Sequence, residues 1–459
     1  MKSRFTALTA LALVVLPSSV GATPQAQAQE ADARADTLTL GRLHEAALRH
    51  DARAAQGALN ESALELRLRS LASEWLPGIR IRGEARYQSD VTRIEAFASE
   101  GEAPVIEFPE VPKDRYEAAL GVEQVLYDGG LIGGRRQVER ARTTETQAHL
   151  ATTLHELRRE VDRAYFSAIA LAAQSDETAL LIADLEARLG QARSGVEAGV
   201  RLPGEAARIE AELLRARQRL DELHGDRRAA ISVLSNLTGE SVEEETVLPL
   251  PMLEAEMAAT RVRAGEPGRM AEAAAVPRRH PAFDAFRGTA ERLAREAELA
   301  GRERRPRIVA FGEAGYGRPG LNQLAEGGDT FWLGGVRVEW APWNWGRTDR
   351  EQELLELRRE AVVTEEEAFA ATLDRAVADE LADLARIRDA LATDEEILGL
   401  RERIERQEER RFAEGVITAA DYVDARTDLL QARVALRLHH IELAQTQARY
   451  LTTLGVPIP

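Results

Sequence analysis

Residues 79–88 carry the pattern that decides the fold, and they read Ile79-Arg80-Ile81-Arg82-Gly83-Glu84-Ala85-Arg86-Tyr87-Gln88. Apolar or small residues alternate with charged or polar ones. Successive side chains of a β-strand point to opposite faces, so the stretch predicts a strand with one apolar and one charged face. Residues 308–316 repeat the apolar face as Ile308, Ala310, Gly312, Ala314 and Tyr316. Two interpretations stay open: a strand that crosses a membrane, and a half-buried hairpin of a soluble protein.

Each of these strands has a candidate partner further along the chain. We predict strands at about 78–88 and 117–127, and again at about 307–316 and 331–341. The last of them places Trp332, Gly334, Val336, Val338 and Trp340 on one face, with aromatic residues near the ends as in membrane strands. We expect the charged residues of the opposite faces to line a water-filled lumen. These are Arg80, Arg82, Glu84, Arg86, Glu123, Arg337 and Glu339.

The chain also contains an internal duplication. The stretch Val196-Glu197-Ala198-Gly199-Val200 matches Phe412-Ala413-Glu414-Gly415-Val416 at an offset of 216 residues. The same offset aligns Tyr127-Asp128-Gly129-Gly130 with Trp343-Asn344-Trp345-Gly346. We therefore divide the chain into a first copy at 37–239, a linker or equatorial segment at 240–277, and a second copy at 278–455.

A long helical hairpin is predicted after the strands of each copy, at about 131–238 and 347–453. Residues 134–193 contain no proline, and leucine and alanine recur at three-to-four spacing among glutamate and arginine. This spacing is typical of long packed helices, and about 60 such residues would extend ~90 Å. The predicted barrel-to-helix turns are Asp128, Gly129, Gly130, Asn344 and Gly346, and the predicted hairpin turns are Gly199, Gly415 and Thr418.

Four strands per chain cannot close a barrel. In lipid, unpaired backbone groups on an open edge cost several kcal/mol each, so membrane strands of this kind must be shared between chains. Eight strands are just filled by side chains, whereas twelve leave a lumen, and the charged inner faces favour twelve. We therefore expect a trimer whose fold is mainly α with a small β part. In it, a long antiparallel coiled-coil α-barrel continues into a shared barrel with four transmembrane β-strands per chain.

Composition limits the classes of partner and site. The 459 residues carry a net charge of -17 and no cysteine. The chain lacks a clustered basic face for phosphates, so we expect no nucleic-acid partner. Without cysteine, disulfides, zinc–thiolate sites and iron–sulfur clusters are excluded, and so is a lipid anchor on an amino-terminal cysteine.

Residues 1–22 have the layout of a secretory signal peptide. Lys2 and Arg4 precede an apolar run, and small residues end the segment at Ala22. Cleavage there would leave a charge of -19, because both removed charges are basic. Beyond this segment, no run of 18 apolar residues predicts a membrane helix.

Taken together, these features resemble the TolC family of outer membrane efflux proteins. The resemblance rests on the signal peptide, the duplication, the Leu76-Pro77 pair before a strand, the Tyr127-Asp128-Gly129-Gly130 turn before a helix, and the Gly415-x-x-Thr418-x-x-Asp421 hairpin. It covers essentially the whole chain after the signal peptide. It implies a homotrimer among outer membrane lipids that spans the periplasm. Through a periplasmic adaptor protein, the trimer would serve an inner-membrane pump in tripartite efflux or type I secretion.

The resemblance also implies an acidic ring at a periplasmic aperture. The family pattern places the acids at Asp421 and Asp424, and Glu205 is the first-copy equivalent of Asp421. Carboxylates around one axis would repel one another, raise some pKa values and favour cations. Phe412 and Ile417 depart from the pattern, where a tethering tyrosine and a basic residue can occur. This departure disfavours a closed state held by the polar latches of some members.

Enzyme signatures are weak throughout. Residues 129–134 are rich in glycine but lack both the Gly-x-Gly-x-x-Gly spacing and a following Lys-Ser/Thr pair. His439 and His440 are adjacent, so they point about 100° apart on a helix. We expect no catalytic residue, no cofactor and no metal site.

Two functions therefore remain. The first is a passive export channel of the outer membrane, whose cargo stays open among drugs, metal ions and polypeptides. The second is a periplasmic coiled-coil scaffold or tether without a pore. Four alternating strands that end in tryptophan and tyrosine favour the channel, since a scaffold has no use for them.

Overall fold

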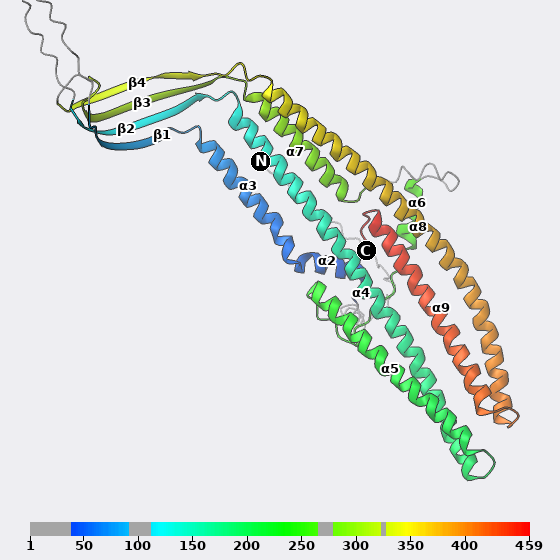
Figure 1. The fold of residues 1–459 in the computed structure, drawn as a ribbon. Coiled ribbons are helices and arrows are strands. Elements are labelled where there is room, and N and C mark those ends of the chain that lie inside the picture. The colour runs from blue at the N-terminus through cyan, green and yellow to red at the C-terminus, as the bar shows by residue number, and fades with distance from the viewer. Residues whose placement is uncertain (1–37, 91–111, 265–278, 323–326) are drawn as a thin grey trace, which may run out of the picture.

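The structure is a computed structural model, and it describes residues 38–90, 112–264, 279–322 and 327–459. The molecule is elongated, with a sheet at one end and two helical hairpin turns at the other (Figure 1). The predicted signal peptide at 1–22 lies outside the described residues. So does most of the stretch between the first two strands.

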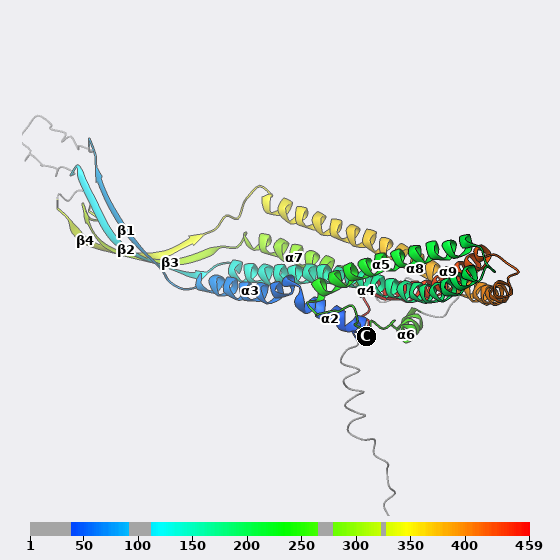
Figure 2. The same cartoon turned by 90° about the horizontal axis from the view of Figure 1, so that it is seen from below.

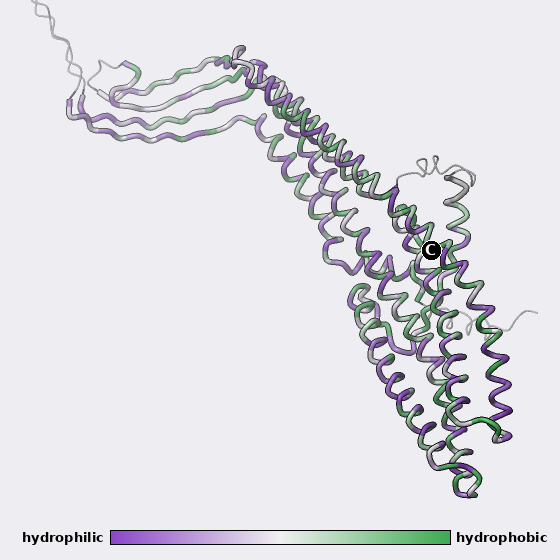
Figure 3. Tube along the Cα trace, turned by 45° about the vertical axis from the view of Figure 1, so that its right-hand side comes forward, coloured by the Kyte–Doolittle hydropathy of each residue, from purple (hydrophilic) through white to green (hydrophobic). Residues whose placement is uncertain are grey.

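Four antiparallel strands form one sheet. They are β1 (Gly78–Tyr87), β2 (Asp114–Tyr127), β3 (Arg307–Arg318) and β4 (Asp329–Glu339), in the order β1-β2-β3-β4. Because β2 belongs to the first copy and β3 to the second, their pairing joins the two copies. Ile81 lies opposite Leu120 on one face, and Arg82 lies opposite Ala119 on the other. Figure 3 shows the hydropathy changing along each strand as this alternation requires.

Most of the other described residues are helical. The helices are α2 (Leu40–His50), the 3-10 helix η1 (Ala52–Ala55), α3 (Gln56–Ser73), α4 (Leu131–Glu197), α5 (Pro203–Thr238), α6 (Glu254–Ala264), α7 (Ala282–Arg302), α8 (Arg347–Ala413) and α9 (Ala419–Thr453). The predicted fold class, mainly α with a small β part, is confirmed. Among the described residues, no helix combines the length and the apolar composition that a membrane span requires.

Two shorter helical regions lie outside the predicted hairpins. Helices α2 and α3 are separated at Asp51, whose carboxylate accepts the N–H of Arg53 at 2.7 Å and starts the 3-10 helix. Helix α6 lies in the segment 240–277, where the sequence shows no clear periodicity. Only a few apolar residues fix it, because Leu253 just before it and Met257 within it are buried in the central core.

The long helices lie side by side and form a curved wall (Figure 2). Near the sheet the neighbours are α3, α4, α7 and α8, and towards the hairpin turns they are α5, α4, α9 and α8. Helices α4 and α8 each contain 67 residues and run the whole distance from the sheet to the turns. At 1.5 Å per residue, each is about 100 Å long. Helix α8 therefore forms one edge of the wall along its full length.

The central core joins the two copies at mid-length. Leu43 of α2, Val161 and Tyr165 of α4, Leu234 of α5 and Leu451 of α9 are essentially inaccessible to solvent. Burial of each large apolar side chain contributes about 1.5–3 kcal/mol, so this core outweighs any single polar contact. The Tyr165 hydroxyl donates to the carbonyl of Pro249, which attaches the connecting segment to the wall.

Buried histidines lie beside this core. His44 Nε2 lies 2.7 Å from Asp162 Oδ1, and His155 Nε2 donates to the carbonyl of Thr452 at 2.8 Å. The ring of His280 packs edge-on against His155 with 4.7 Å between the centroids, and its Nδ1 accepts the N–H of Ala282 at 3.2 Å. These contacts connect α4, the start of α7 and the end of α9.

Burial lowers the pKa of His155 and the pKa of His280 to about 4, and the nearby Arg158 and Arg159 add to the effect. Both rings therefore stay neutral in the folded protein while they bind protons in the unfolded chain below about pH 6.5. Since the unfolded state then binds more protons, stability falls as the pH drops from about 6.5 to about 4.

This titration gives a testable prediction. The double variant His155→Gln, His280→Asn should retain the two hydrogen bonds and lose at least half of the drop in melting temperature between pH 7 and pH 4.5. Thermal unfolding followed by circular dichroism at both pH values measures the drop. His440→Gln, which changes an exposed histidine, is the control and should behave as the parent chain. An equal drop in the double variant and the parent would contradict the assignment.

Candidate functional site

The charged face of the sheet holds several ion pairs. Arg80 lies 3.3 Å from Glu123, and Arg82 reaches Glu117 at 3.8 Å and Glu313 at 3.5 Å. Further pairs join Arg337 to Glu123 and Glu339, Arg307 to Glu339, and Arg86 to Glu84. All seven residues predicted to face a lumen lie on this one face, and all are exposed to solvent except Glu123, which is half-buried. Being exposed, these pairs contribute little stability each and make the face hydrophilic.

The opposite face of the sheet is apolar and equally exposed. Ile81 is 83% accessible and Trp332 is 79% accessible, and Val336, Val338 and Ile79 are similar. The nine residues from Trp332 in β4 to Trp340 just after it are separated by eight steps, which span about 26 Å at ~3.3 Å per residue. That length matches the apolar band of about 25 Å on membrane strands. The two sequence interpretations differ here, because a half-buried soluble hairpin would cover this face.

The first turn between strand and helix is tightly packed. The Asp128 carboxylate is buried and accepts the N–H groups of Gly130 at 2.8 Å and Ile132 at 2.6 Å, so it caps α4. Gly129 and Gly130 have φ of +72° and +87°, a region that favours glycine. Arg305 donates to the carbonyl of Gly129 at 3.2 Å, and Arg302 to that of Gly130 at 3.0 Å. The predicted residues therefore form one turn, and the sequence missed both arginines because they come from the other copy.

The second turn is more open. Asn344 donates through Nδ2 to the hydroxyl of Thr348 at 2.6 Å, and Gly346 has φ of +72°. Trp345, at the position that Gly129 holds in the first copy, also has a positive φ of +55°. The two copies thus share the chain path but differ in what surrounds it.

At the far end, the two hairpin turns have the same geometry. Gly199 and Gly415 have φ of +73° and +74°. The following residues, Val200 and Val416, donate their N–H groups to the carbonyls of Gly195 and Arg411 at 2.9 and 2.8 Å, which closes each helix. These glycines are needed for the left-handed backbone at the turn.

Asp421 is tied to the start of α9. Its carboxylate accepts the backbone N–H of Thr418 at 3.0 Å and the hydroxyl of Thr418 at 2.7 Å, while its own N–H donates to that hydroxyl oxygen at 3.3 Å. This reciprocal arrangement is a capping box. The bonds from Thr418 hold the pKa of Asp421 below its usual value, with help from Arg411 and Arg208.

The two other predicted aperture acids differ from Asp421. Asp424 is exposed and has no hydrogen bond or ion pair within the described part of the chain. Glu205 is half-buried and pairs with Arg201 at 3.4 Å. It does not form a capping box, because the N-cap residue Leu202 has an apolar side chain that cannot hydrogen-bond. The guanidinium of Arg201 in turn lies 4.0 Å from the ring centre of Phe412. Of the three acids, Asp424 is therefore the one whose carboxylate no other described residue engages.

A polar cluster between the two hairpins was not found by sequence reasoning. The Tyr422 hydroxyl donates to Asp184 at 2.7 Å and accepts from Arg188 at 3.1 Å. Burial raises the pKa of Tyr422, and the hydrogen bond to Asp184 raises it further. Arg426 joins Asp184 at 3.1 Å to Glu405 at 3.1 Å, and Arg188 also contacts Glu409.

Phe412, where a tethering tyrosine was sought, instead stacks on Tyr422 with 5.1 Å between centroids. The tyrosine that bridges the hairpins is therefore Tyr422, ten residues later. Its position directly after Asp421 in the duplicated turn was the available signal.

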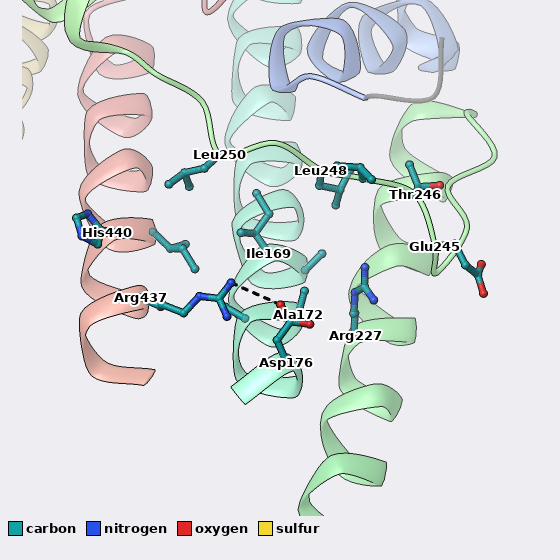
Figure 4. A pocket seen from close by; sticks show the side chains of 14 residues that line it. Ile169, Ala172, Asp176, Arg227, Glu245, Thr246, Leu248, Leu250, Arg437 and His440 are labelled. Atoms are coloured by element: carbon teal, nitrogen blue, oxygen red, sulfur yellow. Dashed lines mark ion pairs between the residues drawn. The ribbon is translucent and has the colours of Figure 1, made fainter. Parts of the chain in front are cut away.

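A groove of about 510 Å³ lies at mid-length between α5 and α9 (Figure 4). Ile169 and Ala172 of α4 line it, Leu248 and Leu250 cover it, and Arg437 pairs there with Asp176 at 3.5 Å. His440 lines this groove, whereas its neighbour His439 bonds Asp394 of α8. The lining offers apolar contacts and an ion pair. No three His, Cys, Asp or Glu residues of the described chain are grouped to hold a metal ion.

Comparison with known proteins identifies the family. The family model described as outer membrane efflux protein matches residues 42–240 and 277–456, which is most of the chain. The chain belongs to the outer membrane efflux protein family. The resemblance to TolC-type channels drawn from the sequence is thereby confirmed. No curated protein matches this efflux protein in sequence.

Solved structures share the fold of this efflux protein. The channel CusC, studied for the conformational changes of folding and transmembrane channel formation, superposes with a TM-score of 0.68 at 14% identity, covering 91% of this chain and 92% of CusC. VceC of Vibrio cholerae gives 0.64 at 15% identity, covering 92% and 97%. The open state of MtrE from Neisseria gonorrhoeae gives 0.63 at 17% identity, covering 91% and 89%.

The polar cluster gives a prediction about the hairpin turns of this efflux protein. Spin labels at Val200→Cys and Val416→Cys report the separation of the two turns, and the chain has no other cysteine. Adding Tyr422→Phe with Arg426→Gln removes three of the bonds between the hairpins, which are those of Tyr422 to Asp184 and Arg188 and that of Arg426 to Asp184. Each is worth about 1.5–3 kcal/mol when charge-assisted. Double electron–electron resonance should then show a broader distribution of the distance between the two labels.

The matched control for that measurement is Arg401→Gln. Arg401 pairs with Asp428 at 2.6 Å within the second hairpin alone, so its loss should leave the separation unchanged. If the Tyr422 variant also keeps the parent distribution, the cluster does not hold the hairpins together.

Proposed function

We propose that this chain forms a homotrimeric outer membrane channel of a tripartite efflux or type I secretion system. The channel conducts substrates passively and performs no chemical step of its own. One observation carries the proposal: the sheet is apolar and exposed on one face and charged on the other, and no further strand of the described residues pairs with its two outer edges. A sheet of this kind suits a position between lipid and water, in a barrel that further chains complete.

The edges support assembly from several copies. Strand β1 runs away from the helices and β4 runs back towards them, so β4 of one chain can pair antiparallel with β1 of the neighbouring chain. The edge helices expose apolar side chains that a neighbour would cover, such as Leu66 of α3 and Leu357 of α8. Three chains supply twelve strands, which leave a lumen for the charged faces, whereas two chains supply eight strands and leave no lumen.

The hairpin turns are the natural periplasmic aperture in this arrangement. They lie about 100 Å from the sheet along α4 and α8, a distance suited to a protein that spans the periplasm. In a trimer, Asp421 and Asp424 contribute six carboxylates around one axis. Glu205 adds less net charge because Arg201 neutralises it. This end would also meet the adaptor protein and, through it, the inner-membrane pump.

Membrane behaviour distinguishes this channel from a periplasmic scaffold or tether. The protein should remain with the outer membrane after a high-salt wash and migrate faster on SDS gels before heating than after, because a closed barrel resists the detergent. Light scattering of the purified protein should give three times the mass of one mature chain. Release by salt together with heat-independent migration would favour the scaffold.

The aperture acids give a quantitative prediction. In planar bilayers, the variant Asp421→Asn, Asp424→Asn should shift the reversal potential in a potassium chloride gradient towards zero, since the fixed charge that attracts cations is removed. The shift should shrink at high salt, where the charges are screened. Asp374→Asn with Asp379→Asn, two exposed acids midway along α8, is the control and should change the potential less. Unchanged selectivity in the first variant would reject the aperture assignment.

A further inference from the structure

All five tryptophans of the chain lie in the sheet or at its junction with the helices. They are Trp75, Trp332, Trp340, Trp343 and Trp345. Every one of them is at least 40% accessible, and Trp343 and Trp345 are 73% and 80% accessible. An indole is a large apolar group with one polar N–H, and it favours the boundary between lipid tails and headgroups. So much exposed indole in one zone points to a partner that covers it.

The Trp343–Trp345 pair is held outward by the backbone. Trp345 has φ of +55°, a region that bulky residues rarely adopt. The two rings pack edge to face with 5.7 Å between centroids. In the first copy the position of Trp345 is Gly129, where a Cβ atom would approach the Cβ of Arg305 to 2.8 Å. Only the second copy therefore has room for this aromatic pair.

The junction around the pair is basic in an acidic protein. Residues 301–307 and 339–350 contain six arginines and three acids, while the whole chain carries -17. The two segments are in contact, because Arg347 reaches Glu303 at 3.9 Å and the Trp340 indole N–H donates to the carbonyl of Arg304 at 3.0 Å. Arg350 is exposed, and its guanidinium group makes no hydrogen bond or ion pair with the described residues. Excess guanidinium groups beside exposed indoles complement a phosphate at an apolar boundary.

We propose that Trp343, Trp345, Arg347 and Arg350 form a phospholipid-binding wedge, in which the indoles enter the headgroup layer of the periplasmic leaflet and the arginines contact anionic lipid phosphates. The wedge continues the apolar face of β4, which ends at Trp340 three residues earlier. The inference rests on the proposed membrane channel and adds its lipid partner. A trimer would carry three such wedges, one from the second copy of each chain. They would set the depth of the barrel in the membrane.

Fluorescence in vesicles tests the indoles. A variant that keeps only Trp343 and Trp345 (Trp75→Phe, Trp332→Phe, Trp340→Phe) is reconstituted as the full-length trimer in phosphatidylcholine–phosphatidylglycerol vesicles. Phospholipids brominated near the headgroup should quench its emission more strongly than phospholipids brominated near the chain end. A second variant, Trp343→Phe with Trp345→Phe in the otherwise unchanged chain, should lose this shallow component and retain the quenching of Trp332.

Lipid selectivity tests the arginines. Spin-labelled phosphatidylglycerol should associate with the parent trimer more strongly than spin-labelled phosphatidylcholine. Arg350→Gln should reduce this preference about fivefold, which corresponds to the ~1 kcal/mol of one basic residue at an anionic surface. Arg358→Gln is the matched control: Arg358 is also exposed and unpaired within the described chain, and it lies eight residues further along α8. Its preference should equal that of the parent.

The outcomes separate this inference from the channel itself. If the trimer inserts and conducts but its Trp343–Trp345 emission resists both brominated lipid and aqueous quencher, a neighbouring chain covers the pair and the wedge is rejected. Quenching by aqueous iodide alone also rejects it, since the pair then stays in water. Equal lipid preference in the Arg350 variant and the parent rejects the phosphate contact. Failure of the parent chain to enter the membrane would overturn the channel proposal as well.

Discussion

The outer edges of β1 and β4 impose the constraint on which the rest of the structure depends. Each edge carries backbone N–H and C=O groups that no other strand of the described residues pairs, and such groups are costly wherever water is absent. In the proposed channel, neighbouring chains supply the missing partners, which reconciles the short sheet with its exposed apolar face and its charged face. The helices repeat this pattern, since α3, α5 and α8 expose apolar side chains along the edges of the wall.

The sequence was sufficient for the features that depend on periodicity. Alternation at residues 79–88 predicted β1 and its two faces, and the proline-free stretch 134–193 predicted α4. Features made by contacts between the copies were out of reach. Tyr422 lies 238 positions from Asp184, and Arg305 lies 176 positions from Gly129, so no local pattern records either contact. Asp421 was found as an acid near a helix start, but its use in a capping box required the geometry of Thr418.

Duplication explains how one chain holds both similar and divergent ends. The turns at Gly199 and Gly415 have nearly the same backbone, yet Glu205 pairs with Arg201 while Asp421 caps a helix. Likewise, Gly129 is enclosed by arginine where Trp345 is exposed. Two copies in one chain can share the architecture and assign different contacts to each position, which a chain with identical repeats could not do.

The unbroken length of α4 and α8 has a mechanical consequence. Each helix joins the sheet to a hairpin turn without a proline in its interior, so each behaves as a lever about 100 Å long. A rotation of about 5° at the sheet end would move the turn by about 9 Å, given the rise of 1.5 Å per residue. A change of packing at mid-length, where the buried histidines lie, acts over about half that length, so the same rotation there would move the turns by about 4 Å.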